Sequence, residues 1–331
     1  MQKKQKKGLT LGKFAPFHKG HQLIIETALD EMDEVIVIIY NASDVTNIPL
    51  QIRSAWIKTL YPQVKVIEAW EGPMEVGNTR EIQKIHEDYI INKLKISGIS
   101  AFYSSEFYGS HMSKALNCEN RQVDPERKII PVSATQIRNA PFKCRNYIHP
   151  IVYKNLITNV VFLGAPSTGK TTLAEKLATE FNTEWMHEYA REYWTKNQIN
   201  RKLSLEQLLD IAMDHIKLED EKIQNSNVYL FTDTNAITTF MFSQYYYGKA
   251  HKELEKLALS ASNRYDINFL CDIDIPYDDT WDRSGDAKRK IFQKQIIADL
   301  HARKLPYYLL KGTIEERIQK VKNILRKHKK Y

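Results

Sequence analysis

Residues 159–172 read NVVFLGAPSTGKTT, an apolar run that passes directly into a glycine-rich loop. The loop matches the pattern G-x-x-x-x-G-K-[ST], which binds phosphates through backbone amides when a strand precedes it and a helix follows it. In such a loop Lys170 reaches the β and γ phosphates, and Thr171 can hold Mg²⁺. The stretch therefore predicts an ATP-binding α/β domain. The residues expected to contact this ATP form one run: Gly164, Ala165, Pro166, Ser167, Thr168, Gly169, Lys170, Thr171 and Thr172.

Downstream of this loop, apolar runs alternate with helical patterns. Strands are expected at 228–232, 269–275 and 307–310, and helices at 173–181, 205–224 and 314–325. Asp233 follows the first of these strands, so it is a candidate Mg²⁺ ligand, with a helix cap as the alternative. Glu188 follows a short strand expected around Trp185. It is a candidate proton acceptor or ribose ligand, and a place on a surface helix is the alternative.

A charge-rich segment, residues 282–289, lies between the last two strands. Arg283 and Arg289 are candidate lid residues that would close on the transferred phosphate. A solvated run of charges explains the same pattern.

The first half of the chain shows a second α/β pattern. Strands are expected at 8–14, 35–40, 64–69 and 99–104, and helices at 21–33 and 78–94. The run at 35–40 is almost continuously apolar, as expected of a strand buried on both faces. Alternating strands and helices predict a parallel sheet covered by helices. The chain is thus predicted to hold two doubly wound α/β domains with parallel sheets.

The loop after the first strand, residues 12–21, reads GKFAPFHKGH. A loop at the carboxyl end of a parallel strand, followed by a helix, is a favourable place for a phosphate. Gly20 lets the backbone come close, and His18 and His21 can both donate hydrogen bonds to one polyphosphate. A metal pair is the weaker alternative because it lacks a third ligand, and two incidental surface histidines are another.

Residues 132–138 read VSATQIR, a loop that enters a helix. Taken alone, Ser133 or Thr135 would be a helix cap. Together with the early His-x-Gly-His, however, this motif resembles nucleotidyltransferases of the class-I-tRNA-synthetase-like superfamily. The resemblance implies that a substrate phosphate attacks the α-phosphate of ATP, with catalysis by positioning and charge neutralisation. The ATP-binding residues that follow from it are Lys13, Phe14, His18, Gly20, His21, Ser133, Thr135 and Arg138.

A nucleotidyltransferase-like half followed by a P-loop kinase-like half is similar to the bifunctional NadR family. Further motifs carry this resemblance: GNTR at 77–80, SEFYG at 105–109 and TDTNAITT at 232–239. The resemblance implies that the rear domain phosphorylates nicotinamide riboside with ATP, giving nicotinamide mononucleotide (NMN). The front domain would then join NMN to the AMP part of ATP, giving NAD and pyrophosphate. ATP is thus a substrate of both reactions and Mg²⁺ the cofactor. The implied catalytic residues are His18 and His21 in front and Lys170, Asp233 and Glu188 behind.

The domain boundaries follow from these patterns. The expected order is a basic tail at 1–8, an NMN adenylyltransferase domain at 9–145, a linker at 146–158, a ribosylnicotinamide kinase domain at 159–325 and a basic tail at 326–331. Some members of the family begin with a helix-turn-helix domain. Only about eight residues precede the first strand here, so neither that domain nor a repressor role is expected. The family also often shows Asp-Gly-x-Arg in the lid, where residues 279–283 read DTWDR.

The composition limits the other functional classes. The formal net charge is +8, and the two tails supply eight positive charges: Lys3, Lys4, Lys6, Lys7, Arg326, Lys327, Lys329 and Lys330. The remainder is near neutral, so a nucleic-acid groove is not expected. The 3 cysteines are far apart, which excludes a disulfide framework and a C-x-x-C metal site. No apolar run approaches the roughly 20 residues that span a bilayer. We therefore expect a cytoplasmic enzyme, which is compatible with a homo-oligomer.

Two alternative functions stay open at this point. The first is an adenylyltransferase–kinase fusion for another phosphorylated metabolite, because the motifs around the phosphates contact only the shared ATP. The second is a nucleotide-sensing regulator with weak turnover. Residues that read the nicotinamide ring are expected within 70–80 and 104–111.

Overall fold

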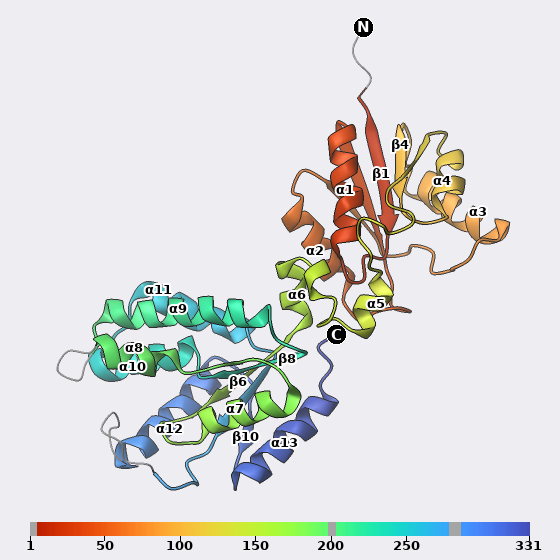
Figure 1. The fold of residues 1–331 in the computed structure, drawn as a ribbon. Coiled ribbons are helices and arrows are strands. Elements are labelled where there is room, and N and C mark those ends of the chain that lie inside the picture. The colour runs from red at the N-terminus through yellow and green to blue at the C-terminus, as the bar shows by residue number, and fades with distance from the viewer. Residues whose placement is uncertain (1–4, 198–202, 278–285) are drawn as a thin grey trace. The chain divides into compact units, whose positions relative to one another are not determined.

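The computed structural model describes residues 5–197, 203–277 and 286–331. These residues form two compact units, and the chain passes from the first to the second between Tyr153 and Lys154 (Figure 1). Each unit has its own parallel β-sheet with helices on both faces. The predicted fold class, two α/β domains with parallel sheets, is confirmed.

The front unit is built on a five-stranded sheet in the order β3-β2-β1-β4-β5. All four neighbouring pairs are parallel. The strands are β1 (Lys7–Gly12), β2 (Glu34–Tyr40), β3 (Lys65–Ala69), β4 (Ala101–Ser104) and β5 (Glu119–Gln122). Strand β2 reads EVIVIIY and is buried from its second residue on, because helices cover both faces of the sheet. Since β1 lies in the centre, the loop after it opens at the middle of the carboxyl edge.

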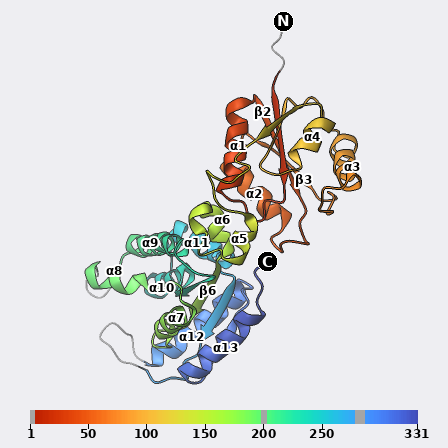
Figure 2. The same ribbon diagram turned by 45° about the vertical axis from the view of Figure 1, so that its right-hand side comes forward.

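Helices flank the front sheet on its two sides (Figures 1 and 2). Helices α1 (Lys19–Glu31) and α2 (Leu50–Leu60) lie on one face, and α3 (Arg80–Asp88) and α4 (Gly109–Ala115) lie on the other. The core between β-sheet and α3–α4 includes the fully buried Leu9, Ile38 and Phe102. A short helix, α5 (Ala134–Asn139), follows β5, and α6 (Pro150–Leu156) spans the boundary between the units.

The rear unit repeats this plan with the strand order β10-β9-β6-β8-β7. Its pairs are also all parallel. The strands are β6 (Thr158–Leu163), β7 (Trp185–Met186), β8 (Tyr229–Asp233), β9 (Ile267–Cys271) and β10 (Tyr308–Leu310). The central strand is β6, so the phosphate loop predicted after it also opens at the middle of a carboxyl edge.

Two layers of helices enclose the rear sheet (Figure 1). Helices α7 (Lys170–Phe181) and α13 (Ile314–Lys327) cover one face and share a core with Phe162, Phe231 and Phe269. The other face is covered by α8 (Tyr189–Asn197), α9 (Leu205–Ile223), α10 (Ala236–Tyr247), α11 (Lys252–Ser260) and α12 (Asp286–Ala302). Helix α13 begins with a capping box, in which Thr313 and Glu316 each satisfy a backbone amide of the other.

The structure differs from the sequence-based expectation at three places. Strand β5 was not expected because it reads ENRQ, and an exposed edge strand carries no apolar signal. The helix expected at 78–94 is an α-helix to Asp88 that continues as a π-turn, Tyr89–Lys93. The segment expected as a linker holds helix α6, since Val152 and Tyr153 are buried. Within the described ranges, no helix is long and apolar enough to cross a membrane.

Candidate active sites

The front site is built on the loop between β1 and α1. His18 is the N-cap of α1, and its Nδ1 accepts a hydrogen bond from the Gly20 amide at 3.1 Å. His21 Nδ1 accepts one from the His18 amide at 3.3 Å. An imidazole nitrogen that accepts a hydrogen bond carries no proton, so each neutral ring holds its proton on Nε2. The helix start therefore orients both imidazoles as Nε2–H donors.

Burial and a nearby cation keep both rings neutral. Burial lowers the pKa of His18 to about 4, and the charge of Arg127 acts in the same direction. The pKa of His21 is held well below its usual value by burial, by His18 and by Arg127. The two rings stack with their centroids 3.8 Å apart, which disfavours charge on both. At neutral pH the pair therefore donates hydrogen bonds without carrying charge.

Small and aromatic residues shape this loop. A Cβ on Gly20 would lie 3.0 Å from Cε1 of His18, so a larger residue would require the imidazole to shift away from the backbone. Phe14 is buried and meets the His21 ring edge-on at 4.9 Å, and Phe17 stacks on the same ring at 5.8 Å. The predicted contact residue Phe14 thus holds His21 in place.

Two guanidinium groups donate hydrogen bonds to backbone carbonyls of the same loop. Arg53 on α2 is 1 % exposed and donates to the carbonyls of Lys13, Tyr40 and Ile48. Arg138 donates to the Ala15 carbonyl at 2.6 Å and to Thr135 Oγ1 at 2.9 Å. The loop carbonyls of Lys13 and Ala15 therefore have fixed partners. The predicted motif residue Arg138 lies at this loop although 123 positions separate it from Ala15.

The remaining residues predicted for this site lie in different local arrangements. The Lys13 ammonium pairs with Asp44 at 2.7 Å. Ser133 is the N-cap of α5 and shares a capping box with Gln136, so the capping alternative describes its local geometry. Thr135 accepts the hydrogen bond from Arg138. Contacts of these residues with ATP phosphates stay predictions.

Arg127 is a cation of the front site that the sequence motifs did not indicate. The Asp124 carboxylate accepts hydrogen bonds from the amides of Lys128, Ile129 and Ile130, which fixes this loop. Arg127 also pairs with Glu106 at 3.0 Å, and its charge reaches both histidines. The sequence did contain a signal for the loop that carries Arg127. Asp124 and the run of polar residues after β5 are typical of a turn.

The rear loop, residues 164–169, has the backbone of a phosphate-binding turn. Gly164, Ser167 and Gly169 have φ values of 141°, 60° and 79°. Alternation between such left-handed positions and ordinary ones turns successive amides toward one centre. The Lys170 ammonium crosses the loop and donates to the Ala165 carbonyl at 3.1 Å. The Ala165 amide donates to Gln293 Oε1 at 2.8 Å, so it is already used within the protein.

The acidic partner of this loop lies at the end of β8. Thr171 Oγ1 donates to Asp233 Oδ2. Asp233 is fully buried, and burial raises its pKa to about 6, against the opposing charge of Lys170. The charge of Glu188 also raises the pKa of Asp233. The sequence-predicted residues Thr171, Lys170, Asp233 and Glu188 thus form one electrostatically linked group.

This group fits a divalent cation. Asp233 Oδ1 is buried and lacks a hydrogen-bond partner among the described residues, and Thr171 Oγ1 adjoins the same carboxylate. Hydroxyl and carboxylate oxygens are the ligands that Mg²⁺ takes beside substrate phosphates. Within the described ranges, no three His, Cys, Asp or Glu side chains gather as a separate metal site.

The two lid candidates have different outcomes. Arg283 lies outside the described residues. Arg289 on α12 is 3 % exposed and donates to the carbonyls of Ser167 and Ile275, both at 3.0 Å. It therefore contacts the phosphate loop from behind, and closure on a transferred phosphate stays a prediction.

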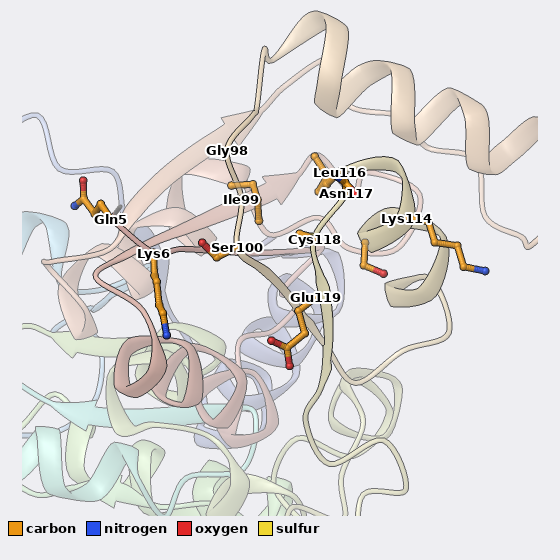
Figure 3. A pocket seen from close by; sticks show the side chains of 11 residues that line it. Gln5, Lys6, Gly98, Ile99, Ser100, Lys114, Leu116, Asn117, Cys118 and Glu119 are labelled. Carbon is orange, nitrogen blue, oxygen red and sulfur yellow. The ribbon is translucent and has the colours of Figure 1, made fainter. Parts of the chain in front are cut away.

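A separate hollow of about 890 Å³ lies at the opposite, amino-terminal edge of the front sheet (Figure 3). Lys6, Ser100 and Glu119 line it, together with Cys118. Burial raises the pKa of the Cys118 thiol to about 11, so this cysteine is a poor nucleophile. The residues that line the hollow include neither an imidazole nor the glycine-rich loop motif, and we assign it no chemistry.

Comparisons with known families match the two units separately. Residues 9–140 match the cytidylyltransferase-like family, and residues 159–317 match an AAA domain family of P-loop proteins. The trifunctional NAD biosynthesis/regulator protein NadR of Salmonella typhimurium is 27% identical over 332 residues, which covers 92% of this chain and 78% of that protein. NadR of Escherichia coli is also 27% identical, over 92% of this chain and 79% of its own. The chain is similar to NadR proteins over most of its length.

Solved structures agree with this similarity at the level of the fold. A crystal structure of NadR protein in complex with NAD and AMP-PNP covers 97% of this chain and 96% of its own, with a TM-score of 0.56 and 22% identity. A crystal structure of NadR protein in complex with NR gives the same TM-score and identity and is covered to 95%. The two-unit α/β architecture is therefore shared over nearly the whole length of these proteins.

Proposed function

We propose that this chain is a bifunctional enzyme of NAD salvage that uses ATP at two separate sites. The observation that carries the proposal is the presence of two phosphate loops, each at the carboxyl edge of its own parallel sheet. The matches to cytidylyltransferase-like and AAA families, and to NadR proteins over 92% of the chain, support it. ATP, nicotinamide riboside, NMN and NAD are the small molecules it would bind.

The front unit would transfer an adenylyl group. A phosphate oxygen of NMN attacks the α-phosphorus of ATP, the bond to the β-phosphate breaks, and NAD and pyrophosphate form. His18 and His21 would donate their Nε2–H groups to phosphate oxygens as negative charge shifts to the leaving group. Both donors are fixed by backbone hydrogen bonds, so they need no reorganisation during the reaction. Arg127 would add a positive charge beside them.

The rear unit would transfer the γ-phosphoryl group of ATP to the hydroxyl of nicotinamide riboside, giving NMN and ADP. The loop amides and Lys170 would hold the β and γ phosphates. Thr171 and Asp233 would hold Mg²⁺, which neutralises phosphate charge when it is bound. Glu188 lies close enough to Asp233 to affect its pKa, and it would accept the proton of the substrate hydroxyl.

The two sites can be separated by one substitution in each. Lys170→Ala should abolish formation of NMN and ADP from the riboside and Mg-ATP, while supplied NMN is still converted to NAD. His21→Ala should do the reverse, because it removes a donor from the front loop only. We expect losses of about 100-fold or more, as for other removed transition-state donors. Chromatography of the products measures both reactions.

Lys176 is exposed on α7, the helix that begins with Lys170. Lys176→Ala is therefore the matched control, since it leaves the loop untouched. Equal loss of both reactions in either site variant would contradict two separate sites. A wild-type protein that binds ATP but phosphorylates no riboside would favour the regulator. Adenylyl transfer to a different phosphorylated metabolite would favour the fusion for another substrate.

A further inference from the structure

The back of the rear phosphate loop is held by side chains from the last two helices of the chain. Gln293 on α12 accepts a hydrogen bond from the Ala165 amide at 2.8 Å and donates to the Cys271 carbonyl at 3.0 Å. Arg317 on α13 donates to the Thr168 carbonyl at 2.7 Å. Both side chains are at most 3 % exposed. These contacts join the loop to residues that lie more than a hundred positions away.

The geometry of a phosphate loop explains why it needs such partners. Amides that turn inward to phosphate force the carbonyls of the same peptides outward, into the protein. A buried carbonyl without a donor costs free energy, and so does a non-glycine residue with positive φ, such as Ser167. Arg317 satisfies the outward carbonyl of Thr168, directly beside that strained position.

Arg317 also connects the loop to the rigid end of the sheet. Its Nε donates to the Gly312 carbonyl at 3.0 Å, and Nη2 donates to the Asp272 carbonyl at 3.3 Å and pairs with the Asp274 carboxylate. Asp272 directly follows β9, and Gly312 lies two residues beyond β10. A single guanidinium thus fixes the loop relative to two neighbouring strands.

We propose that Arg317 and Gln293 are positioning residues for the rear phosphate loop. They set the direction of the peptide groups from Ala165 to Gly169, and through these groups they set the affinity for the triphosphate and the alignment of its γ-phosphoryl group. The proposal deepens the kinase function proposed above and rests on it. Neither residue belongs to the phosphate-loop motif itself.

The test uses full-length variants in which the hydrogen bonds are lost but the volume is roughly kept. Arg317→Met and Gln293→Met should each raise KM for ATP in riboside phosphorylation by about 10-fold and lower kcat, because a small displacement of the loop misplaces the reacting phosphoryl group. KM for the riboside and the front-site conversion of NMN to NAD should stay within two-fold of wild type. Arg326→Met and Gln295→Met, exposed on the same two helices, are the matched controls.

These measurements distinguish positioning from a purely structural role. A loss of folded protein lowers the apparent kcat but leaves KM for ATP unchanged. Arg317→Lys keeps one donor and the charge beside Asp274, so it should recover part of the ATP affinity. If the methionine variants fail to fold, Arg317→Lys decides, because it loses most of the guanidinium donors, and it should still raise KM for ATP. An unchanged KM for ATP in every folded variant overturns the proposal.

A binding experiment keeps this proposal separate from the proposed reaction. Calorimetric titration with Mg-AMP-PNP should show a binding step that Lys170→Ala removes, and this step belongs to the rear loop. Its Kd should rise about 10-fold in Arg317→Met even if the wild-type protein phosphorylates no riboside. Absence of riboside phosphorylation would count against the kinase, whereas an unchanged Kd for this step would count against positioning.

Discussion

At the scale of single residues, the two sites set the charge of their reactive groups by burial. Burial keeps His18 and His21 uncharged, and it holds a proton on Asp233 at pH values where an ordinary aspartate is ionised. Neutral imidazoles suit a site that donates hydrogen bonds to a leaving pyrophosphate. A carboxylate that is costly to ionise suits a site that binds a cation, because the cation offsets the cost.

Asp233→Asn tests whether the same carboxylate lowers the stability of the rear unit and is required for phosphorylation. The raised pKa means that folding disfavours the ionised carboxylate, so stability falls as pH rises from about 4 through about 6, by up to about 3 kcal/mol for a shift of this size. The amide removes the buried charge and should raise the unfolding midpoint of the rear unit at pH 8. Riboside phosphorylation should fall about 100-fold or more, because a cation ligand is lost.

Thermal unfolding at pH 5 and pH 8, with product chromatography, measures both effects. Asp210→Asn, on the exposed side of α9, is the control and should change neither. In wild type, kcat/KM for Mg-ATP should decline as pH drops below about 6, since this ratio reports the free enzyme, in which a protonated Asp233 is a poor cation ligand. A pH profile that is flat down to pH 4.5 would contradict the raised pKa.

At the scale of elements, the two strand–loop–helix units differ in the groups that they offer to the proposed phosphate ligands. In helix α1 the Gly20 amide donates to the His18 imidazole and the His21 amide donates to the His18 carbonyl, so both amides are occupied. In the proposed reaction the front loop would therefore offer side-chain Nε2–H groups to the polyphosphate. Helix α7 begins directly after Gly169, whose backbone has a left-handed conformation. No side chain at this N-cap position accepts a hydrogen bond from the helix. Its first amides and the positive end of its dipole are available to phosphate.

Gly164→Ala tests the backbone requirement of the rear loop. A Cβ there would lie 2.7 Å from the Cys271 carbonyl oxygen, at a φ of 141°. We expect the loop to shift, with riboside phosphorylation reduced about 100-fold and the rear unit destabilised by about 1–3 kcal/mol. Gly248→Ala is the matched control, since its φ of 63° carries strain but no atom lies within 4 Å. It should destabilise the protein slightly and leave phosphorylation intact. Equal effects of the two substitutions would refute a steric role for Gly164.

At the scale of the whole molecule, each unit folds around a core of its own. The front core holds Ile38 on β2, and the rear core on one side of its sheet holds Val161 on β6. Both side chains are fully buried. Each sheet is closed by helices from its own half of the chain, so each unit contains the hydrophobic contacts that a domain needs.

Ile38→Ala and Val161→Ala test whether the units unfold separately. Truncation of Ile38 should cost about 2–5 kcal/mol and lower the midpoint of the front transition and the yield of adenylyl transfer. Val161→Ala removes fewer atoms and should lower the rear midpoint by less, with riboside phosphorylation affected instead. Differential scanning calorimetry resolves the two transitions. A shift of both transitions by either substitution would mean that the units unfold as one.

Local sequence patterns were sufficient to predict the two α/β layouts and to propose the loops as phosphate-binding sites. Strand β2 reads as a buried strand, and the loops after β1 and β6 carry glycine, histidine and lysine where phosphate chemistry requires them. Only the tertiary structure shows what holds those loops. Arg317 lies 149 positions from Thr168, and Arg53 lies 40 from Lys13. Periodicity predicts which face of a helix is buried, but the partner of a buried guanidinium depends on chain segments that folding alone brings together.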